Sequence, residues 1–180
     1  MNICVFAAAS NTIDPAYIAL GEAFGEELGR RGHTMIFGAG CNGLMGAAAR
    51  GVARYNGTTV GVVPSFFDRP GVLAECTERI FTETLNERKT IMETRADAYV
   101  ALPGGVGTME EIFEVITLKH LKRENKPIAF LDAKGYWLPA VELLRQAVER
   151  GFTKPELLTK FGYFEDAARC LDYLEHEKNG

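Results

Sequence analysis

The chain has 180 residues, of which 47% are hydrophobic and 24% charged, and its formal net charge is −4. This composition excludes a disordered chain, and the length is typical of one globular domain, so we expect residues 1–180 to form a single domain. An acidic protein has no overall attraction for nucleic acid, and no apolar run approaches the roughly 20 residues that span a bilayer. The N-terminus lacks the features of a secretory signal. We therefore expect a cytoplasmic protein that binds neither nucleic acid nor membrane.

Short apolar runs alternate along the chain with longer segments of helical periodicity. The predicted strands are residues 3–7, 34–37, 59–63, 79–81, 98–102 and 128–131. The first predicted helix begins at Pro15, with Asp14 as its N-cap, and ends at Gly32. Further helices are predicted over residues 44–55, 85–94, a segment after residue 105, 137–150 and 165–174. We expect the tail after residue 174 to fray. This alternation predicts an α/β fold, a Rossmann-like doubly wound parallel sheet flanked by helices. Such sheets bind ligands beyond the carboxyl ends of their strands.

The first glycine cluster is FGAGCNGLMG, residues 37–46, in which Gly38, Gly40 and Gly43 satisfy the spacing GxGxxG. A dinucleotide site would also need an acidic residue near the end of the following strand, and that strand ends in GVVPSFF without one. Two interpretations stay open. The glycines contact a ligand directly, or they form a tight turn that lets a helix pack closely on the sheet.

The second cluster is PGGVGTMEE, residues 103–111, directly after the predicted strand DAYVAL. Successive backbone N–H groups of Gly104, Gly105 and Gly107 would point into one concavity at a helix start, where the helix dipole favours an anion. The hydroxyl of Thr108 adds a donor. No lysine follows the last glycine, so the loop is not of the triphosphate-binding Walker A type. A monophosphate fits this loop better.

The two adjacent carboxylates that follow the glycines have two interpretations. Thr108 and Glu111 stand in T-x-x-E spacing, so they could form a capping box, with Glu110 and Glu114 merely favourable near a helix N-terminus. Alternatively, Glu111 is catalytic. Local sequence alone slightly favours the capping box.

Four motifs, in order GAGCNGLMG, GVVP, LNERKTIM and PGGVGTMEE, resemble the LOG family, the cytokinin riboside 5′-monophosphate phosphoribohydrolases, often labelled lysine decarboxylases. The resemblance covers roughly residues 2–137. It implies hydrolysis of the N-glycosidic bond of a nucleoside 5′-monophosphate, with a cytokinin nucleotide or AMP as substrate. It also implies a homodimer that needs no cofactor and no metal.

The resemblance further implies roles for particular residues. Glu111 and Arg88 match the family's catalytic carboxylate and its arginine partner, and Lys89 lies beside them as a substrate contact. The implied phosphate and substrate contacts are Gly104, Gly105, Val106, Gly107, Thr108, Thr117 and Ser10. The sequence departs from the family at FAAAS and at GAG, which leaves the preferred base open.

Three other interpretations compete with the enzymatic one. Glu87, Arg88 and Lys89 could form an ordinary solvated helix face. A related family of molybdenum cofactor carriers shares the fold, so the chain could bind a nucleotide or that cofactor without catalysis. An amino acid decarboxylase would need a Schiff-base lysine in a pyridoxal phosphate site, and Lys89 is the only lysine in the motifs.

Overall fold

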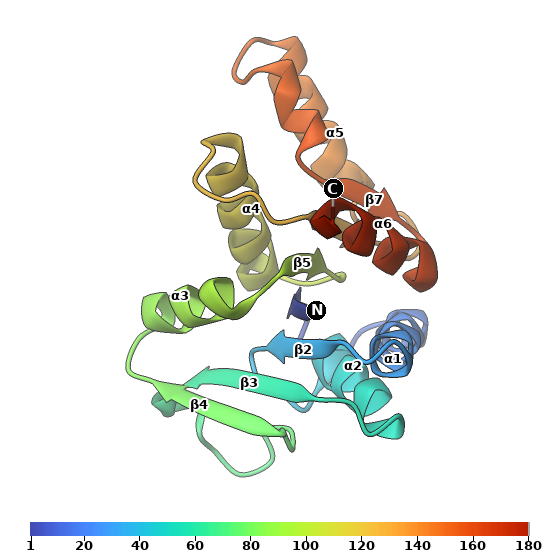
Figure 1. The fold of residues 1–180 in the computed structure, drawn as a ribbon, viewed down its shortest axis with the longest axis vertical. Helices are drawn as coiled ribbons and strands as arrows, with labels where there is room; N and C mark the ends of the chain where they lie inside the picture. The colour runs from blue at the N-terminus through green and yellow to red at the C-terminus, as the bar shows by residue number, and fades with distance from the viewer. Residues whose placement is uncertain (180) are drawn as a thin grey trace.

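Seven strands form one parallel sheet in this computed structural model, which describes residues 1–179 (Figure 1). The strands are β1 (Asn2–Phe6), β2 (Thr34–Phe37), β3 (Thr59–Pro64), β4 (Glu78–Thr82), β5 (Ala98–Ala101), β6 (Ile128–Leu131) and β7 (Gly162–Phe164). Their spatial order is β4-β3-β2-β1-β5-β6-β7, and every neighbouring pair is parallel. The chain thus builds the sheet outward from β1 in one direction and then crosses back to β5, which confirms the doubly wound fold.

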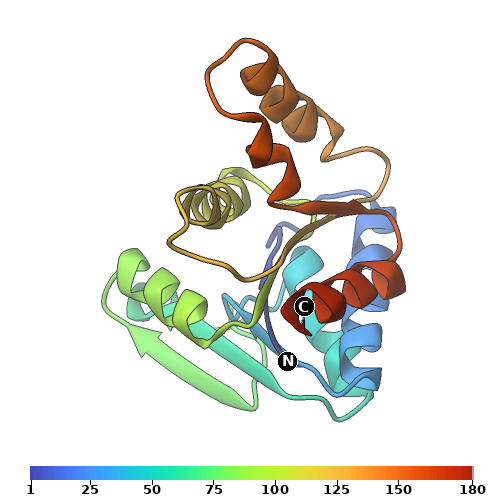
Figure 2. The same ribbon diagram turned by 45° about the horizontal axis from the view of Figure 1, so that its top comes forward.

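Six α-helices in the described residues cover the two faces of the sheet (Figure 2). They are α1 (Pro15–Arg30), α2 (Gly43–Arg54), α3 (Leu85–Arg95), α4 (Val106–His120), α5 (Leu138–Glu149) and α6 (Ala167–Asn179), with short 3₁₀ helices η1 (Ser65–Phe67) and η2 (Pro155–Thr159). One hydrophobic cluster joins α1, α2 and α6 to one face, and a second joins α3, α4 and α5 to the other.

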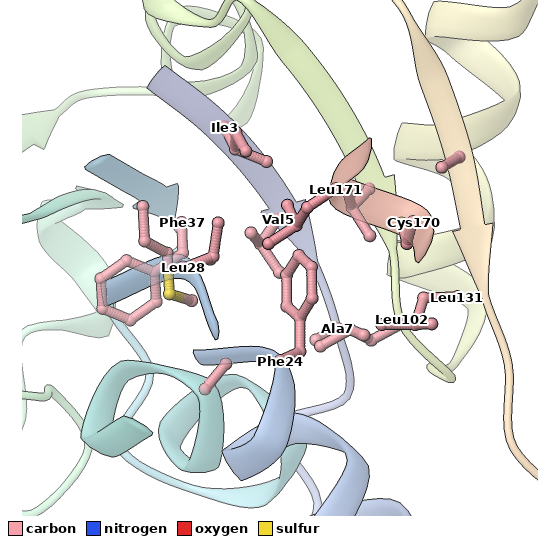
Figure 3. Close-up of a cluster of buried hydrophobic side chains, with 14 of the residues drawn as sticks. Ile3, Val5, Ala7, Phe24, Leu28, Phe37, Leu102, Leu131, Cys170 and Leu171 are labelled. Carbon is pink, nitrogen blue, oxygen red and sulfur yellow. The ribbon is translucent and has the colours of Figure 1, made fainter. Parts of the chain in front are cut away.

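Alternate side chains of β1 belong to the two hydrophobic clusters on opposite faces of the sheet. Ile3 and Val5 face α1, where Figure 3 shows them beside Phe24 and Leu28. Cys4 and Phe6 belong to the opposite cluster. Because successive residues of a strand point to opposite faces, a strand buried on both sides reads as one continuous apolar run.

The six predicted strands are all present, with boundaries within one residue at each end, and Asp14 caps α1 as predicted. Strand β7 escaped prediction because three residues at a sheet edge are too few to show a period of two. The prediction of a fraying tail after residue 174 was wrong. Helix α6 continues to Asn179, and Lys178 Nζ lies 2.9 Å from Asp97 Oδ1.

Helices α1 and α2 approach each other closely along a stripe of three glycines, Gly21, Gly25 and Gly29. A Cβ at Gly25 would lie 2.0 Å from the carbonyl oxygen of Ala48, and one at Gly21 would lie 2.9 Å from that of Leu44. Residues four apart share one face of a helix, so the stripe forms a groove into which α2 fits. This packing fixes the start of α2 beside the end of β1.

The point where the chain reverses lies between β1 and β5, and the segments that follow β1, β2, β3 and β5 meet there. Both glycine clusters lie at this edge of the sheet, as the sequence predicted. Within the described residues, no helix is long and apolar enough to span a membrane.

Candidate active site

A pocket of about 490 Å³ opens at the carboxyl ends of these central strands. Most of its wall is apolar, and only three of the side chains that line it are polar. The lining residues are Ala7, Ala8, Ala9, Gly38, Gly40, Met45, Val63, Pro64, Phe67, Val72, Leu73, Leu85, Arg88, Gly105, Val106, Gly107, Thr108 and Glu111. Residues from both glycine motifs and from the LNERKTIM motif therefore meet in one cavity.

Arg88 enters this pocket from the second turn of α3, which begins after the N-cap Thr84. Its Nε donates to the carbonyl oxygen of Val62, 3.1 Å away, and its Nη1 lies 2.5 Å from Glu111 Oε1. The guanidinium is mostly buried. The interpretation of Arg88 as part of a solvated helix face is therefore wrong.

Gly38 makes room for this guanidinium. A Cβ at position 38 would lie 2.5 Å from Arg88 Nη2. The glycines of the first cluster thus divide between the two open interpretations. Gly38 and Gly40 line the pocket, whereas Gly43, at φ +59°, packs against the carbonyl oxygens of Ala8 and Ser10 and shapes the turn into α2.

Glu111 projects from the second turn of α4 and is 8% exposed. Burial raises the pKa of its carboxyl group above the usual value for glutamate, although the charge of Arg88 and its hydrogen bond oppose this shift. Burial thus disfavours the charged form of this carboxyl group, whereas Arg88 favours it. This is the electrostatic environment in which acid–base residues are commonly found.

The capping-box interpretation of Thr108 and Glu111 is wrong. Helix α4 begins at Val106 after the N-cap Gly105, so Thr108 lies inside the first turn. Its hydroxyl packs against Gly104, where a Cβ would come within 2.1 Å of Oγ1. Glu111 turns toward Arg88 instead of back to the helix start.

The glycine loop leaves the first amides of α4 open to the pocket. The first N–H groups of a helix have no partner within it, and the dipole favours an anion at this end. A Cβ at Gly105 or Gly107 would meet no atom within 4 Å, and Val106 is 84% exposed. The loop can therefore admit an anionic group next to the Arg88–Glu111 pair.

Four predicted site residues do not line this cavity. Gly104 is buried, and its carbonyl oxygen accepts a hydrogen bond from the Tyr136 hydroxyl. Lys89 pairs with Glu110 and with Glu114 Oε2, 2.7 Å away, and lines a smaller adjoining hollow of about 380 Å³. Ser10 bonds to Thr12 Oγ1 at 2.9 Å, and Thr117 donates to the carbonyl oxygen of Phe113 at 2.7 Å. Neither Ser10 nor Thr117 is among the residues that line the pocket.

One apolar wall of the pocket was not predicted from the sequence. The segment that follows β3 folds back over the first glycine cluster, where Cys41 N donates to Val72 O at 2.9 Å and Ala74 N to Ala39 O at 2.7 Å. This brings Phe67, Val72 and Leu73 to the pocket. Their apolar character did not indicate a role in the pocket, because the segment shows neither helical nor strand periodicity.

The pKa of Glu111 predicts a pH-dependent difference in stability between the protein and its Glu111→Gln variant. A carboxyl group whose pKa is raised on folding contributes most to stability below its unfolded pKa, and this contribution is lost as the pH rises through the folded pKa. Urea denaturation of both proteins between pH 4 and 8 should show the wild type losing stability relative to Glu111→Gln as the pH rises. A relative gain would mean that Arg88 outweighs burial.

A family model described as "Possible lysine decarboxylase" matches residues 45–174 of this chain. The probable cytokinin riboside 5′-monophosphate phosphoribohydrolase LOGL3 of Oryza sativa subsp. japonica is 32% identical over 96% of this chain and 82% of its own length. The cytokinin riboside 5′-monophosphate phosphoribohydrolase of Rhodococcoides fascians is 35% identical over 86% of this chain and 79% of its own.

Solved structures of molybdenum cofactor proteins share the fold. The carrier protein from Chlamydomonas reinhardtii has a TM-score of 0.75 at 19% identity and covers 99% of this chain and 98% of its own. The binding protein from Rippkaea orientalis has a TM-score of 0.72 at 18% identity, with 97% and 95% covered. At these identities the likeness concerns the fold alone. The family model and the closer sequence relatives show that the chain belongs to the LOG family.

Proposed function

We propose that this chain hydrolyses the N-glycosidic bond of nucleoside 5′-monophosphates, cytokinin riboside 5′-monophosphate or AMP, to the free base and ribose 5-phosphate. The observation that carries this proposal is the buried Arg88–Glu111 ion pair beside the open amides of the glycine loop, within one pocket. An anion-binding loop next to a carboxylate is what cleavage of a phosphorylated riboside requires. The names of the curated relatives support the same reaction.

The glycine loop supplies the binding energy in this proposal. The 5′-phosphate would accept from the amides of residues 105–107 and from the Thr108 hydroxyl. Anchoring the phosphate places the ribose one helical turn further along α4, beside Glu111. Binding energy from the phosphate, which does not itself react, then orients the glycosidic bond for cleavage.

Glu111 would act on the sugar. Cleavage of the bond between base and ribose passes through an oxocarbenium-like state, whose positive charge a nearby carboxylate stabilises. The same carboxylate can hold the ribose hydroxyls and orient or deprotonate the attacking water. Arg88 favours the ionised form of Glu111 and would supply a fixed positive charge toward the substrate or the departing base.

The apolar wall would contact the base of the substrate. Phe67, Val72 and Leu73 offer contact area for a purine ring and for an apolar substituent on it, but their side chains offer no hydrogen bonds. An N6-isopentenyl adenine therefore fits this wall at least as well as adenine does. Lys89, which is held by two carboxylates, gives no support to the decarboxylase interpretation.

The first experiment measures base release from AMP and from N6-isopentenyl AMP, each beside its dephosphorylated nucleoside, with ribose 5-phosphate followed as co-product. We expect release from the monophosphates alone, because the phosphate positions the sugar. Glu111→Gln should reduce turnover by about 100-fold or more. Tight binding of the monophosphates without cleavage would instead favour a nucleotide or molybdenum cofactor carrier, the function named for the structural neighbours.

Gly38→Ala tests how Arg88 is held in place. The added methyl group would displace the guanidinium, so we expect turnover to fall about 10- to 100-fold. Because the displaced guanidinium would leave Glu111 buried without its partner, the free energy of unfolding should also fall, by roughly 1–3 kcal/mol. In an Arg88→Ala background the substitution should cost nothing further, because its effect passes through Arg88. Equal losses in both backgrounds would refute this explanation.

We further propose that the chain forms a homodimer over the apolar surface around the pocket mouth. Phe67, Leu85 and Val106 are exposed and line the pocket, and Phe66, Phe81 and Met109 are exposed on η1, β4 and α4. Sedimentation equilibrium should give twice the mass of the chain, and Met109→Glu should shift it toward the monomer. Leu143→Glu, on the exposed face of α5, is the matched control. A monomer at all concentrations would exclude the dimer.

A further inference from the structure

The glycine loop is tied from two sides by hydrogen bonds to its carbonyl groups. The amide of Ala8, just after β1, donates to the carbonyl oxygen of Pro103 at 3.1 Å. On the other side, the hydroxyl of Tyr136 donates to the carbonyl oxygen of Gly104. Tyr136 follows β6, so the two ties come from the strands on either side of β5.

These hydrogen bonds determine the direction in which the amides of the loop point. In a trans peptide the carbonyl and the following N–H point in opposite directions. When Tyr136 holds the carbonyl of Gly104, the N–H of Gly105 therefore points away from Tyr136. Gly105 is exposed and lines the pocket, so an amide that points away from Tyr136 at this position can face the cavity. A glycine peptide without this tie could rotate more freely than any other.

Tyr136 is itself held firmly by its surroundings. Its backbone amide donates to Oδ1 of Asp132 at 2.9 Å, and Asp132 is 1% exposed at the end of β6. Its ring packs edge-on against Tyr17, with centroids 6.0 Å apart, and against Trp137, with centroids 5.1 Å apart. These contacts hold the ring so that its hydroxyl lies at the carbonyl oxygen of Gly104.

We propose that Tyr136 is a positioning residue for phosphate binding: its hydroxyl fixes the Gly104–Gly105 peptide so that the Gly105 amide meets the 5′-phosphate. Tyr136 is not among the residues that line the pocket, so it acts through the loop. The inference rests on the proposed function, since it assigns the loop to a phosphate.

The test replaces Tyr136 with Phe, which keeps the ring and removes only the hydroxyl. Calorimetric titration with ribose 5-phosphate should show affinity reduced about threefold to tenfold, the range expected for one hydrogen bond. The KM for AMP or N6-isopentenyl AMP should rise by a similar factor while kcat changes less than about twofold, because the reacting centre is untouched.

Tyr99→Phe is the matched control. Tyr99 lies on β5, which leads into the loop, but its hydroxyl donates to Glu124 Oε2 at 2.8 Å, away from the pocket. It should leave ribose 5-phosphate affinity and KM unchanged, even if it lowers thermal stability.

Three results would overturn the inference: unchanged ribose 5-phosphate affinity in folded Tyr136→Phe, a fall in kcat at constant KM, or an equal loss of affinity in Tyr99→Phe. The binding measurement separates this inference from the reaction. If the wild type binds ribose 5-phosphate but cleaves no nucleotide, the hydrolase proposal fails, whereas weaker binding by Tyr136→Phe still supports the positioning role.

Discussion

The buried ion pair between Arg88 and Glu111 is the constraint on which the rest of the site depends. Two charges removed from water are costly unless they are paired and hydrogen-bonded, and here the guanidinium also donates to the carbonyl of Val62. Space for the pair exists because position 38 has no side chain. Burial still raises the pKa of Glu111, so the fold keeps a carboxylate where it is electrostatically unfavourable. Such an electrostatically unfavourable arrangement is typical of functional sites rather than of residues that stabilise the fold.

The architecture separates two groups that would repel each other. A phosphate needs the open amides at the start of α4, whereas the carboxylate of Glu111 would oppose it if both faced the same way. The helix resolves this conflict, because Glu111 projects sideways toward Arg88 one turn beyond the amides, which point along the axis. The PGGVGTMEE motif thereby combines an anion site with an adjacent, neutralised carboxylate.

The elements around the pocket differ in how rigidly they are held. Helix α2 packs closely against the glycine stripe of α1. The loop after β5 is hydrogen-bonded to the amide of Ala8 and to the hydroxyl of Tyr136. The apolar wall instead comes from the long connection after β3, which contacts the first glycine cluster through a few backbone hydrogen bonds. The glycine loop and the helix that carries Glu111 are thus anchored to the sheet, whereas the apolar wall lies on a loop, where sequence can vary most.

The sequence by itself determined the alternation of strands and helices and the position of both glycine clusters at the carboxyl ends of strands, because period and turn chemistry are local. Arg88 and Glu111 were singled out only by the resemblance to the LOG family. The sequence left the role of Glu111 open between cap and catalyst, and it missed β7, the apolar wall and Tyr136. Those were decided by tertiary structure. Arg88 and Glu111 lie 23 positions apart, and Tyr136 lies 32 from Gly104. The first contact depends on the return of the chain from β4 to β5, and the second on the pairing of β5 with β6, so no local pattern records either of them.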